Sequence, residues 1–465
     1  MRQNQRDWGE PMTASLDEAK RIHFIGIGGC SMSGIARILK AQGHEVSGSD
    51  RDRTQFTDRL ERDGVTVYYG HRAEQAAGAD LIVYSAAIKP DNPERVYGRE
   101  HGIPELERSV ALGQLSARFR EVIAVAGCHG KTTITSMLAF VNEEANLDAT
   151  VHVGGFMELL GGGVRLGTSD LFITEACEYV ESFLTLKPTI AIVNNIDNDH
   201  LDYYGDIEHI VAAFRKFLAL VPDDGRILAC IDDAYVRDLL PELGDNVVTY
   251  GLKEGDIHAG ELSFDALGSP SFDLFDHGEK VGRVTLNVPG RHNVVNALAV
   301  YAASKLCGVS FPDYARAMER FRNTSRRFEL LGEKNGVKVF HDYGHHPNEI
   351  KETLAAATHV PHGKIFCVFQ CNSYTRARTL FCENVTCFKD ADEVLVPDIY
   401  PGREVDTGVV HARDMVAGIN RETHNAQYLG TFENIAAYLD EHAVPGDIVI
   451  TVGSGDVYRQ SQKLL

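Results

Sequence analysis

The fold follows from one stretch of the chain, VIAVAGCHGKTTITSML at residues 122–138. The apolar and β-branched residues 122–126 predict a buried strand, and residues 133–141 have a helical pattern. A glycine-bearing turn at 127–132 joins the two. A strand, such a turn and a helix start together cradle phosphate groups, because backbone N–H groups point at the bound anion. We therefore predict a phosphate-binding loop at residues 127–132.

Two side chains of this turn fit that prediction. Lys131 has the length to reach the β- and γ-phosphates of a nucleotide, and the Thr132 hydroxyl is a ligand for Mg²⁺. Val125 stands where the standard loop pattern has a glycine. The alternative is an ordinary strand-to-helix turn with a surface lysine, but the order of strand, turn and helix favours the phosphate loop.

A second glycine-rich turn, GIGGCSMSG at residues 26–34, follows an apolar strand at 22–25. A further strand ends at Asp50, about twenty residues after the turn. This spacing is typical of a nucleotide diphosphate at a helix N-terminus, with the acidic residue on the ribose. A redox site for NAD is the commonest alternative for one glycine fingerprint, but it would leave the phosphate loop without a purpose.

Strands alternate with helices along most of the chain, which predicts an α/β fold with mostly parallel sheets. A length of 465 residues indicates about three domains of ~150 residues each. We place them at 20–118, 119–326 and 327–465, after a flexible extension at 1–19. Residues 247–288 contain short strands separated by turns, and we expect them to form a small antiparallel appendage.

The composition limits the classes of partner. With 66 acidic and 46 basic residues the net charge is −20, and a chain of this kind without a basic stripe is a poor binder of nucleic acid. The sequence has no run of about 18 apolar residues, so we expect no membrane span, and its N-terminus lacks the apolar segment of a signal peptide. Nine scattered cysteines are typical of free thiols. We expect a cytoplasmic protein, monomer or homodimer, acting on small molecules.

Polar residues follow the predicted strands of the central domain. Glu175 ends one strand and His200 follows the next. Ligands of parallel sheets bind at these strand ends, and Mg²⁺ prefers oxygen ligands, so both residues are candidate metal ligands with the imidazole the less typical one. Asn293 and Asn296 share one helix face, where they either bind the nucleotide or, for Asn293, cap the helix.

These motifs together resemble the Mur ligases, ATP-dependent enzymes that form amides in peptidoglycan synthesis. The resemblance covers about residues 20–460 and rests on colinear segments: IHFIGIGGCSMSGIA, GCHGKTT, EACEYVESFL, NNIDNDHLD, GRHNVVNALA, RRFE, DYGHHPNEI, QCNSYTRARTLF and DIYPGRE. It implies a Rossmann-like UDP-binding domain, a P-loop ATPase domain, and a Rossmann-like C-terminal domain that brings the amino acid and closes the nucleotide site.

The resemblance also implies a reaction and its site residues. ATP and Mg²⁺ would be the cofactors, and the carboxylate of UDP-N-acetylmuramate would be joined to L-alanine through an acyl phosphate. The catalytic residues implied are Lys131, Glu175, His200 and Arg327, with Thr132, Glu175 and His200 on the metal. The ATP site implied is Gly127, Cys128, His129, Gly130, Lys131, Thr132, Thr133, Asn293, Asn296, Arg327 and Asp342. The UDP-sugar site implied is Gly26, Gly28, Gly29, Met32, Ser33, Asp50, Ser85 and His129. The amino-acid site implied is Tyr343, His345 and Arg376.

The amino-acid site allows a separate expectation from its chemistry. A guanidinium is the natural partner of a carboxylate, so we expect Arg376, or failing it Arg378, to hold the amino acid, with Tyr343 limiting the space for its side chain. The base that takes the proton of the amine is left open between His200 and His345.

The chain departs from the family pattern at three places. Cys128 replaces a usual threonine, and residues 177–179, CEY, replace a commoner acidic string. Cys371-Asn372 stands where the family usually has Pro-His, which removes an imidazole from the expected amino-acid site. A ligase for another amino acid, or for a preformed peptide, is therefore the alternative function. A third possibility is an inactive nucleotide-binding sensor, but such a protein would not need its lysine, threonine and metal ligands together.

Overall fold

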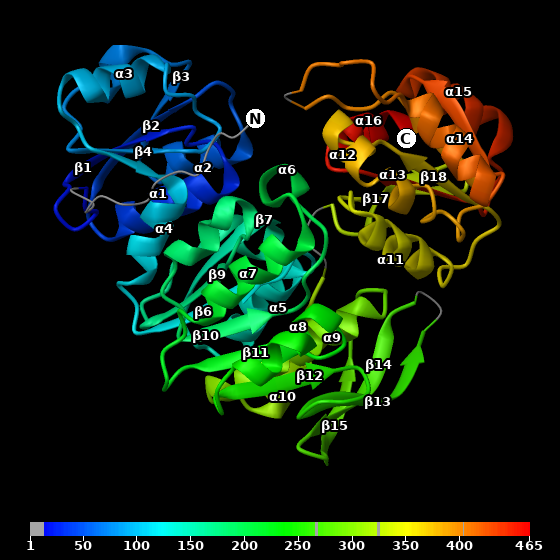
Figure 1. The fold of residues 1–465 in the computed structure, drawn as a ribbon, viewed down its shortest axis with the longest axis horizontal. Helices are drawn as coiled ribbons and strands as arrows, with labels where there is room; N and C mark the ends of the chain where they lie inside the picture. Colours follow the sequence, from blue (N-terminus) through cyan, green and yellow to red (C-terminus); the bar gives the residue numbers. More distant parts are fainter. Residues whose placement is uncertain (1–13, 266–267, 323–325, 403) are drawn as a thin grey trace. The chain divides into compact units, whose positions relative to one another are not determined.

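The computed structural model describes residues 14–265, 268–322, 326–402 and 404–465, and the chain divides into two compact units. The first unit holds the residues up to 124 together with 148–176 and 181–189. The second holds 125–147, 177–180 and 190–465, drawn mostly from green to red in Figure 1. The boundary between the units passes through strand β6 (Glu121–Ala126), which leads into the phosphate loop.

The first unit is built on a parallel sheet, drawn mostly in blue in Figure 1. The order of its strands is β3-β2-β1-β4-β5. Its strands are β1 (Arg21–Ile25), β2 (Glu45–Asp50), β3 (Thr66–Tyr69), β4 (Leu81–Tyr84) and β5 (Glu105–Glu107). Its helices are α1 (Cys30–Ala41), α2 (Gln55–Arg62), α3 (Pro93–Glu100) and α4 (Arg108–Ser116). β2 and β3 lie on one side of β1, and β4 and β5 lie on the other, so the order of strands changes direction at β1. The glycine-rich turn leaves the carboxyl end of this central strand, where α/β sheets bind ligands.

The same unit contains a second group of strands, β7 (Thr150–Met157), β8 (Gly162–Arg165) and β9 (Leu171–Glu175). β7 pairs parallel with β9 and antiparallel with β8, and α1 packs on β7 and β8.

Residues 1–13 of the predicted extension at 1–19 lie outside the described residues. Its remainder packs against α4: Ala14 and Leu16 are buried, and the Leu16 N–H donates to Gln114 Oε1 at 2.8 Å. The Gln114 amide in turn donates to the Ala14 carbonyl at 3.0 Å. Residues 14–19 therefore belong to the packed structure of the first unit.

In the second unit, β10 (Ile190–Val193), β11 (Arg226–Cys230), β12 (Val247–Gly251) and β13 (Ile257–Phe264) pair parallel in turn. β14 (Pro270–Asp276) and β15 (Glu279–Thr285) then pair antiparallel. The expectation of an antiparallel appendage at 247–288 was therefore wrong for β12. β12 pairs parallel with β11 because the chain between them crosses over through α8 (Ala234–Leu239). The few apolar residues from 247 onward do not reveal this crossover.

The helices of this part include α5 (Lys131–Glu144), α6 (Leu201–Tyr204), α7 (Ile207–Leu218), α9 (His292–Leu306) and α10 (Phe311–Arg320). α5 packs against α9 and α10. The Asn194 N–H, just after β10, donates to the Ala126 carbonyl at 3.1 Å. This bond places the ends of β6 and β10 side by side, next to the phosphate loop.

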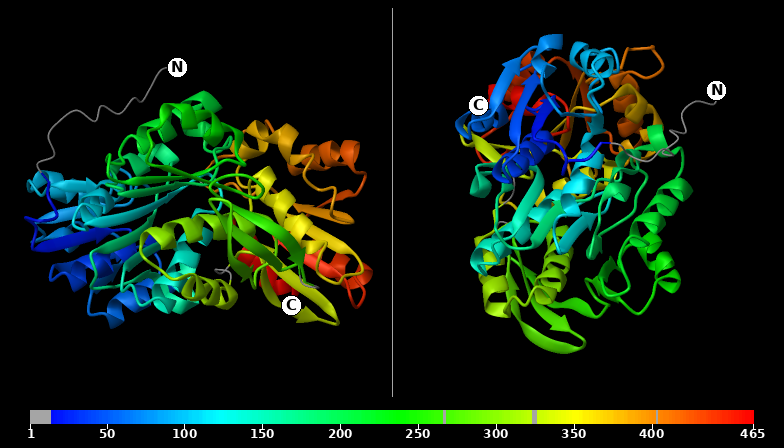
Figure 2. Two further views of the ribbon diagram at one scale, coloured as in Figure 1. Left: turned by 90° about the horizontal axis from the view of Figure 1, so that it is seen from below. Right: turned by 90° about the vertical axis from the view of Figure 1, so that its left-hand side faces the viewer.

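The C-terminal part of the second unit has a six-stranded sheet in the order β16-β17-β21-β18-β19-β20, yellow to red in Figure 2. Only β16 is antiparallel to its neighbour. The strands are β16 (Glu329–Lys334), β17 (Val337–Asp342), β18 (Ile365–Phe369), β19 (Glu393–Pro397), β20 (Ala426–Gly430) and β21 (Ile448–Val452). The helices are α11 (Pro347–Ala357), α12 (Tyr374–Thr379), α13 (Phe381–Asn384), α14 (Ala412–Glu422), α15 (Phe432–His442) and α16 (Val457–Ser461). The predicted α/β fold with mostly parallel sheets is confirmed.

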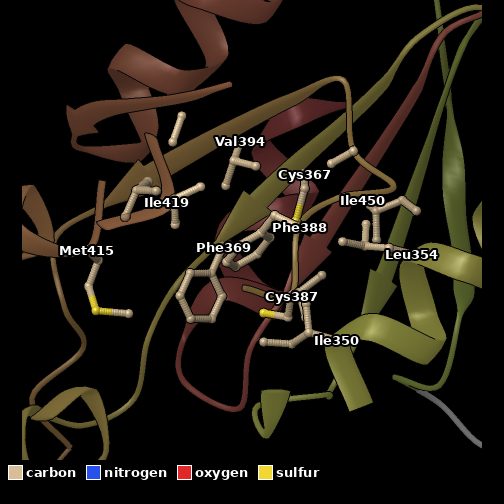
Figure 3. Packing of buried hydrophobic residues seen from close by; sticks show 14 of the residues in the cluster. Ile350, Leu354, Cys367, Phe369, Cys387, Phe388, Val394, Met415, Ile419 and Ile450 are labelled. Atoms are coloured by element: carbon tan, nitrogen blue, oxygen red, sulfur yellow. The ribbon is translucent and has the colours of Figure 1, made fainter. Parts of the chain in front are cut away.

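Successive residues of β18 enter cores on opposite faces of this sheet, as the period of a strand requires. Cys367 and Phe369 pack with Phe388 and Ile450 on one face (Figure 3). Phe366 and Val368 pack on the other face. Phe369 and Asp342 both lie opposite Val452 in register. The residues that follow β17 and β18 therefore emerge at one edge of the sheet. Among the described residues, no helix is both long and apolar enough to cross a bilayer.

Candidate active site

The phosphate loop has the backbone that anion binding requires. Gly130, the residue before α5, has φ 87°, a left-handed conformation that glycine adopts without strain. A side chain there would also lie 2.8 Å from the amide of Asn194 and from Asn296. Because glycine cannot cap the helix with a side chain, the first N–H groups of α5 remain available to an anion.

Lys131 forms a nearly buried ion pair with Glu178. Its Nζ lies 2.8 and 2.9 Å from the two carboxylate oxygens and also donates to the carbonyls of Gly127 and Cys128. Burial alone would lower the pKa of Lys131, but the carboxylate of Glu178 outweighs it and holds that pKa above its ordinary value. The lysine is therefore a fixed positive charge in the loop.

Glu178 also belongs to a group of possible cation ligands with Asp199 and His200, which we call the cation cluster. His200 Nε2 lies 3.7 Å from a carboxylate oxygen of each acid. Burial alone would raise the pKa of Asp199, but the charges of His200 and Arg376 hold it well below its usual range. Two carboxylates and one imidazole give a mainly oxygen donor set, which fits Mg²⁺.

The predicted metal ligands are divided between the two units. His200 lies in the cation cluster, and Thr132 lies in the first turn of α5. Glu175 ends β9 in the first unit, where its Oε1 accepts the Gly154 N–H at 2.6 Å. Its role as a metal ligand stays a prediction. Glu178 and Asp199 were not predicted, although each is within three residues of a residue that was.

His129 of the phosphate loop lies between two carboxylates. Its Nε2 is 2.9 Å from Asp197 Oδ2, and its Nδ1 is 3.3 Å from Glu349 Oε1 in α11. Burial alone would lower the pKa of His129, but the hydrogen bonds to both acids outweigh it and raise that pKa to about 10. Burial would likewise raise the pKa of Asp197, but His129 and its neighbours lower it to about 2. His129 is therefore a second fixed cation of the loop.

A cavity of about 320 Å³, which we call the nucleotide cavity, opens beside these groups. Among its lining residues are seven that were predicted to bind ATP: His129, Gly130, Thr133, Asn293, Asn296, Arg327 and Asp342. The structure thus brings together residues from both sides of the predicted boundary at 326. Cys128 instead directs its thiol to the Asp197 carbonyl at 3.4 Å, so its contribution to the loop is that of its backbone.

Asn293 and Asn296 line the nucleotide cavity, and hydrogen bonds fix both side chains. Arg291 is the residue before α9, so the alternative that Asn293 caps the helix is wrong. The Asn293 amide instead donates to the Pro289 carbonyl at 2.7 Å. The Asn296 amide donates to Asn293 Oδ1 at 3.1 Å, and Asn296 Oδ1 accepts from the Asn194 amide at 3.2 Å. This chain of amides fixes the cavity wall next to Gly130.

A second cavity of about 200 Å³, the arginine pocket, adjoins the cation cluster. Arg376 lies 3.5 Å from Asp199 Oδ1 and donates to the Asn372 carbonyl at 2.8 Å. Tyr179, Leu380 and Glu404 are among the lining residues, whereas Tyr343 and His345 are not. Tyr343 follows β17, which is separated from β18 by β21. Side-chain space in this pocket is therefore limited by Tyr179 and Leu380.

Tyr343 and His345 lie between β17 and α11. The Tyr343 ring faces the Arg327 guanidinium at 5.5 Å, and the His345 N–H donates to Glu349 Oε2 at 3.0 Å. Burial lowers the pKa of His345 to about 4, so its imidazole is neutral at pH 7. Their binding of the amino acid stays a prediction.

The predicted UDP-sugar residues lie in the first unit, except His129. Gly29 precedes α1 and leaves its first N–H groups available, and the Gly28 N–H donates to Asp50 Oδ2 at 2.8 Å. A side chain at Gly26 would lie 3.5 Å from Ser85 Cβ. The loop, Asp50 and Ser85 therefore share one sheet edge.

The other two residues predicted for this site, Met32 and Ser33, are buried in α1. The Ser33 hydroxyl donates to the Cys30 carbonyl at 2.8 Å, so it is already occupied within the helix.

Comparison with known proteins covers almost the whole chain. The model described as "Mur ligase family, catalytic domain" matches residues 21–120, "Mur ligase middle domain" matches 125–304, and "Mur ligase, glutamate ligase domain" matches 326–455. The chain belongs to the Mur ligase family.

Individual family members show the same extent of similarity. The UDP-N-acetylmuramate–L-alanine ligase of Alkaliphilus metalliredigens is 47% identical over 97% of this chain and 98% of its own length. That of Acetivibrio thermocellus is 45% identical over 96% of both chains. The solved UDP-N-acetylmuramate–alanine ligase of Thermotoga maritima is 28% identical, with a TM-score of 0.79 over 96% of this chain and 98% of its own. A murein peptide ligase from Psychrobacter arcticus is 26% identical, with a TM-score of 0.68 over the same shares.

The charge on Lys131 leads to a first prediction. We predict that the Lys131 cation stabilises the transferring phosphoryl group, so Lys131→Ala should lower phosphate release from ATP at least about a hundredfold, the scale for one such donor. Lys253→Ala, at an exposed lysine of the same unit, is the matched control. Phosphate release near the wild-type rate, from a variant with an unchanged circular dichroism spectrum, would show that the loop does not act in this way.

The shifted pKa of His129 leads to a second prediction. Its pKa is about 10 in the folded state against an ordinary value of 6.5, so the stabilising effect is complete below pH 6.5 and is lost as the pH rises through 10. We expect the free energy of unfolding of the wild type, relative to His129→Gln, to fall over this range. The fall should be at least about 1.4 kcal/mol, the equivalent of one pKa unit.

Urea denaturation at several pH values measures this difference, and His442→Gln, at an exposed histidine, is the control. Parallel stability curves for the wild type and His129→Gln would contradict the assignment.

Proposed function

We propose that this chain uses ATP to join L-alanine to the carboxylate of UDP-N-acetylmuramate, in peptidoglycan precursor synthesis. The observation that carries the proposal is one continuous row of charges. Lys131 contacts Glu178, Glu178 and Asp199 flank His200, and Asp199 contacts Arg376. A phosphate site, a cation site and a carboxylate site thus adjoin one another. The curated relatives at 43–47% identity, each named as this ligase, support the same reaction.

The reaction proceeds in two steps. The carboxylate of UDP-N-acetylmuramate attacks the γ-phosphorus of ATP, the bond to ADP breaks, and an acyl phosphate forms. The amine of alanine then attacks the acyl carbon, a tetrahedral intermediate forms, and phosphate leaves as the amide is completed. The protein contributes chiefly by positioning the reactants and by stabilising the negative charge that develops.

Lys131 supplies the fixed charge for the first step. Its pairing with Glu178 keeps the ammonium in place before the nucleotide arrives, and phosphate oxygens then become its additional partners. Glu178, Asp199 and His200 would hold Mg²⁺, together with the predicted ligand Thr132 of the same unit. Mg²⁺ would supply positive charge to the phosphoryl oxygens.

The nucleotide cavity explains how the C-terminal domain takes part. Arg327 and Asp342 line it with Asn293 and Asn296 of the middle domain, so a nucleotide bound there contacts both. Burial raises the pKa of Asp342, whose oxygens accept N–H groups from Phe328 and Gly344 at 2.8 and 2.6 Å. This fixed carboxylate is suited to accept hydrogen bonds from the hydroxyl groups of a ribose. ATP and UDP-sugars are small dissolved molecules, and we place the enzyme in the cytoplasm.

Release of inorganic phosphate from ATP tests the proposal. The reaction mixture contains UDP-N-acetylmuramate and one member of a panel: L-alanine, other amino acids, or a preformed murein peptide. We expect release with L-alanine, less with serine or glycine, and little with branched amino acids. Release with the peptide alone would favour the alternative function, which the Asn372 departure and the similarity to a peptide ligase suggest. The absence of release with every member would indicate a sensor.

Arg376 leads to a third prediction. Arg376→Lys cannot form the paired hydrogen bonds to a carboxylate, so we expect the KM for L-alanine to rise at least about tenfold while the KM for ATP stays within about twofold. Arg378→Lys is the matched control, because Arg378 is exposed on the same helix and does not line the pocket. An unchanged KM for alanine in Arg376→Lys, or leucine used as well as alanine, would contradict the assignment of this pocket.

A further inference from the structure

A second group of metal-ligating side chains lies apart from the cation cluster. It consists of His129 in the phosphate loop, Asp197 after β10 and His346 before α11, and we call it the histidine triad. His129 Nε2 lies 2.9 Å and His346 Nδ1 lies 3.4 Å from the same atom, Asp197 Oδ2. Ligands at about 2.0–2.1 Å from a tetrahedral Zn²⁺ are separated by about 3.3 Å. The spacing of the triad is therefore already close to that of a zinc site.

Histidines that bind a metal usually donate their second ring N–H to a carboxylate or a backbone carbonyl. Both imidazoles of the triad have such an outer contact. His129 Nδ1 faces Glu349 Oε1 at 3.3 Å, and His346 Nε2 faces the Asn198 carbonyl at 3.3 Å. The other oxygen of Asp197 accepts the Asn198 N–H at 2.8 Å. One nitrogen of each imidazole and one carboxylate oxygen are thus turned toward one another.

Asn348 contacts two of the triad atoms that a bound ion would need, Asp197 Oδ2 and His346 Nδ1. Its side-chain amide donates to Asp197 Oδ2 at 2.7 Å, and its backbone N–H lies 3.4 Å from His346 Nδ1. The backbone contact is long for a hydrogen bond. A bound ion would take the place of the proton between His129 and Asp197 and leave the outer contacts to Glu349 and Asn198 unchanged.

We propose that the histidine triad is a binding site for a transition-metal ion of the Zn²⁺ class, separate from the magnesium of catalysis, and that its occupancy inhibits the enzyme. Two imidazoles and one carboxylate suit Zn²⁺ better than Mg²⁺. The ligands come from the phosphate loop, from the end of β10 and from the start of α11. A bound ion therefore ties the loop to the C-terminal domain and hinders the exchange of nucleotides in the cavity beside it.

The binding part of the proposal is tested without substrates. Zn²⁺ is titrated into the full chain, free of nucleotide and Mg²⁺, against a chromophoric chelator. We expect one tight site in the wild type and at least about tenfold weaker binding in His346→Gln and in Asp197→Asn. Co²⁺ should show the visible absorption of tetrahedral coordination only where the triad is intact.

His209→Gln is the matched control, because His209 also pairs with an aspartate, Asp206, but is exposed and has no part in the triad. Equal Zn²⁺ binding by the wild type and both triad variants, with unchanged circular dichroism, would overturn the site. Loss of binding in His209→Gln alone would do the same, since it would place the ion at the surface.

The inhibitory part rests on the proposed function and is measured separately. At fixed MgATP, the Zn²⁺ concentration that halves phosphate release should be at least about tenfold higher for His346→Gln, relative to its own uninhibited rate. The same inhibition curve for both proteins would overturn the inhibitory role. Phosphate release by the wild type without Zn²⁺ tests the proposed function independently of either result.

Discussion

The buried pair between Lys131 and Glu178 is the interaction on which the site depends. Burying two charges carries a large desolvation penalty, which is offset only when both groups are well paired. Here the lysine contacts both carboxylate oxygens and two loop carbonyls, and the Tyr204 hydroxyl donates to the Glu178 carbonyl. The pair therefore fixes the position of the phosphate loop more than it adds stability. In the proposed reaction it would hold the charge where phosphoryl transfer requires it, so little rearrangement would be needed when the substrate binds.

The same arrangement recurs around the site and explains how an acidic protein binds anionic substrates. Arg376 faces Asp199, and His129 faces Asp197 and Glu349. Each cation is held by a carboxylate of the protein, and we propose that a phosphate or carboxylate group of a substrate takes over this role on binding. With a net charge of −20, local positive charge must be concentrated in this way to attract a nucleotide. The acidic partners also keep the cations ordered in the absence of ligand.

The elements with strong local signals could be predicted from the sequence. The strands predicted at 22–25 and 122–126 correspond to β1 and β6, each one residue longer, since apolar runs define them. The phosphate loop follows from its glycines and lysine. Of the predicted residues that line the nucleotide cavity, His129 and Gly130 follow β6 and Asp342 ends β17, and ligands of parallel sheets bind at such strand ends.

What the sequence did not reveal depends on tertiary contacts. Glu178 and Glu349 belong to the site because they pair with Lys131 and His129 of the phosphate loop. Lys131 and Glu178 are 47 residues apart, and the residues next to Glu178 in the sequence do not indicate so distant a partner. The pairing of β12 depends on a crossover, and the burial of Leu16 depends on α4, about a hundred residues later. Tyr179 lines the arginine pocket in place of Tyr343 for the same reason.

In the proposed reaction the charged phosphate loop directs phosphoryl transfer from ATP to the carboxylate of the sugar nucleotide. Transfer of ¹⁸O tests it most directly. UDP-N-acetylmuramate labelled with ¹⁸O in its carboxylate is converted with ATP and L-alanine, and the released phosphate is analysed by mass spectrometry. An acyl phosphate requires that each phosphate carry one oxygen from the carboxylate, so we expect one ¹⁸O per molecule released. Unlabelled phosphate would show that the carboxylate does not attack ATP, and it would contradict the account.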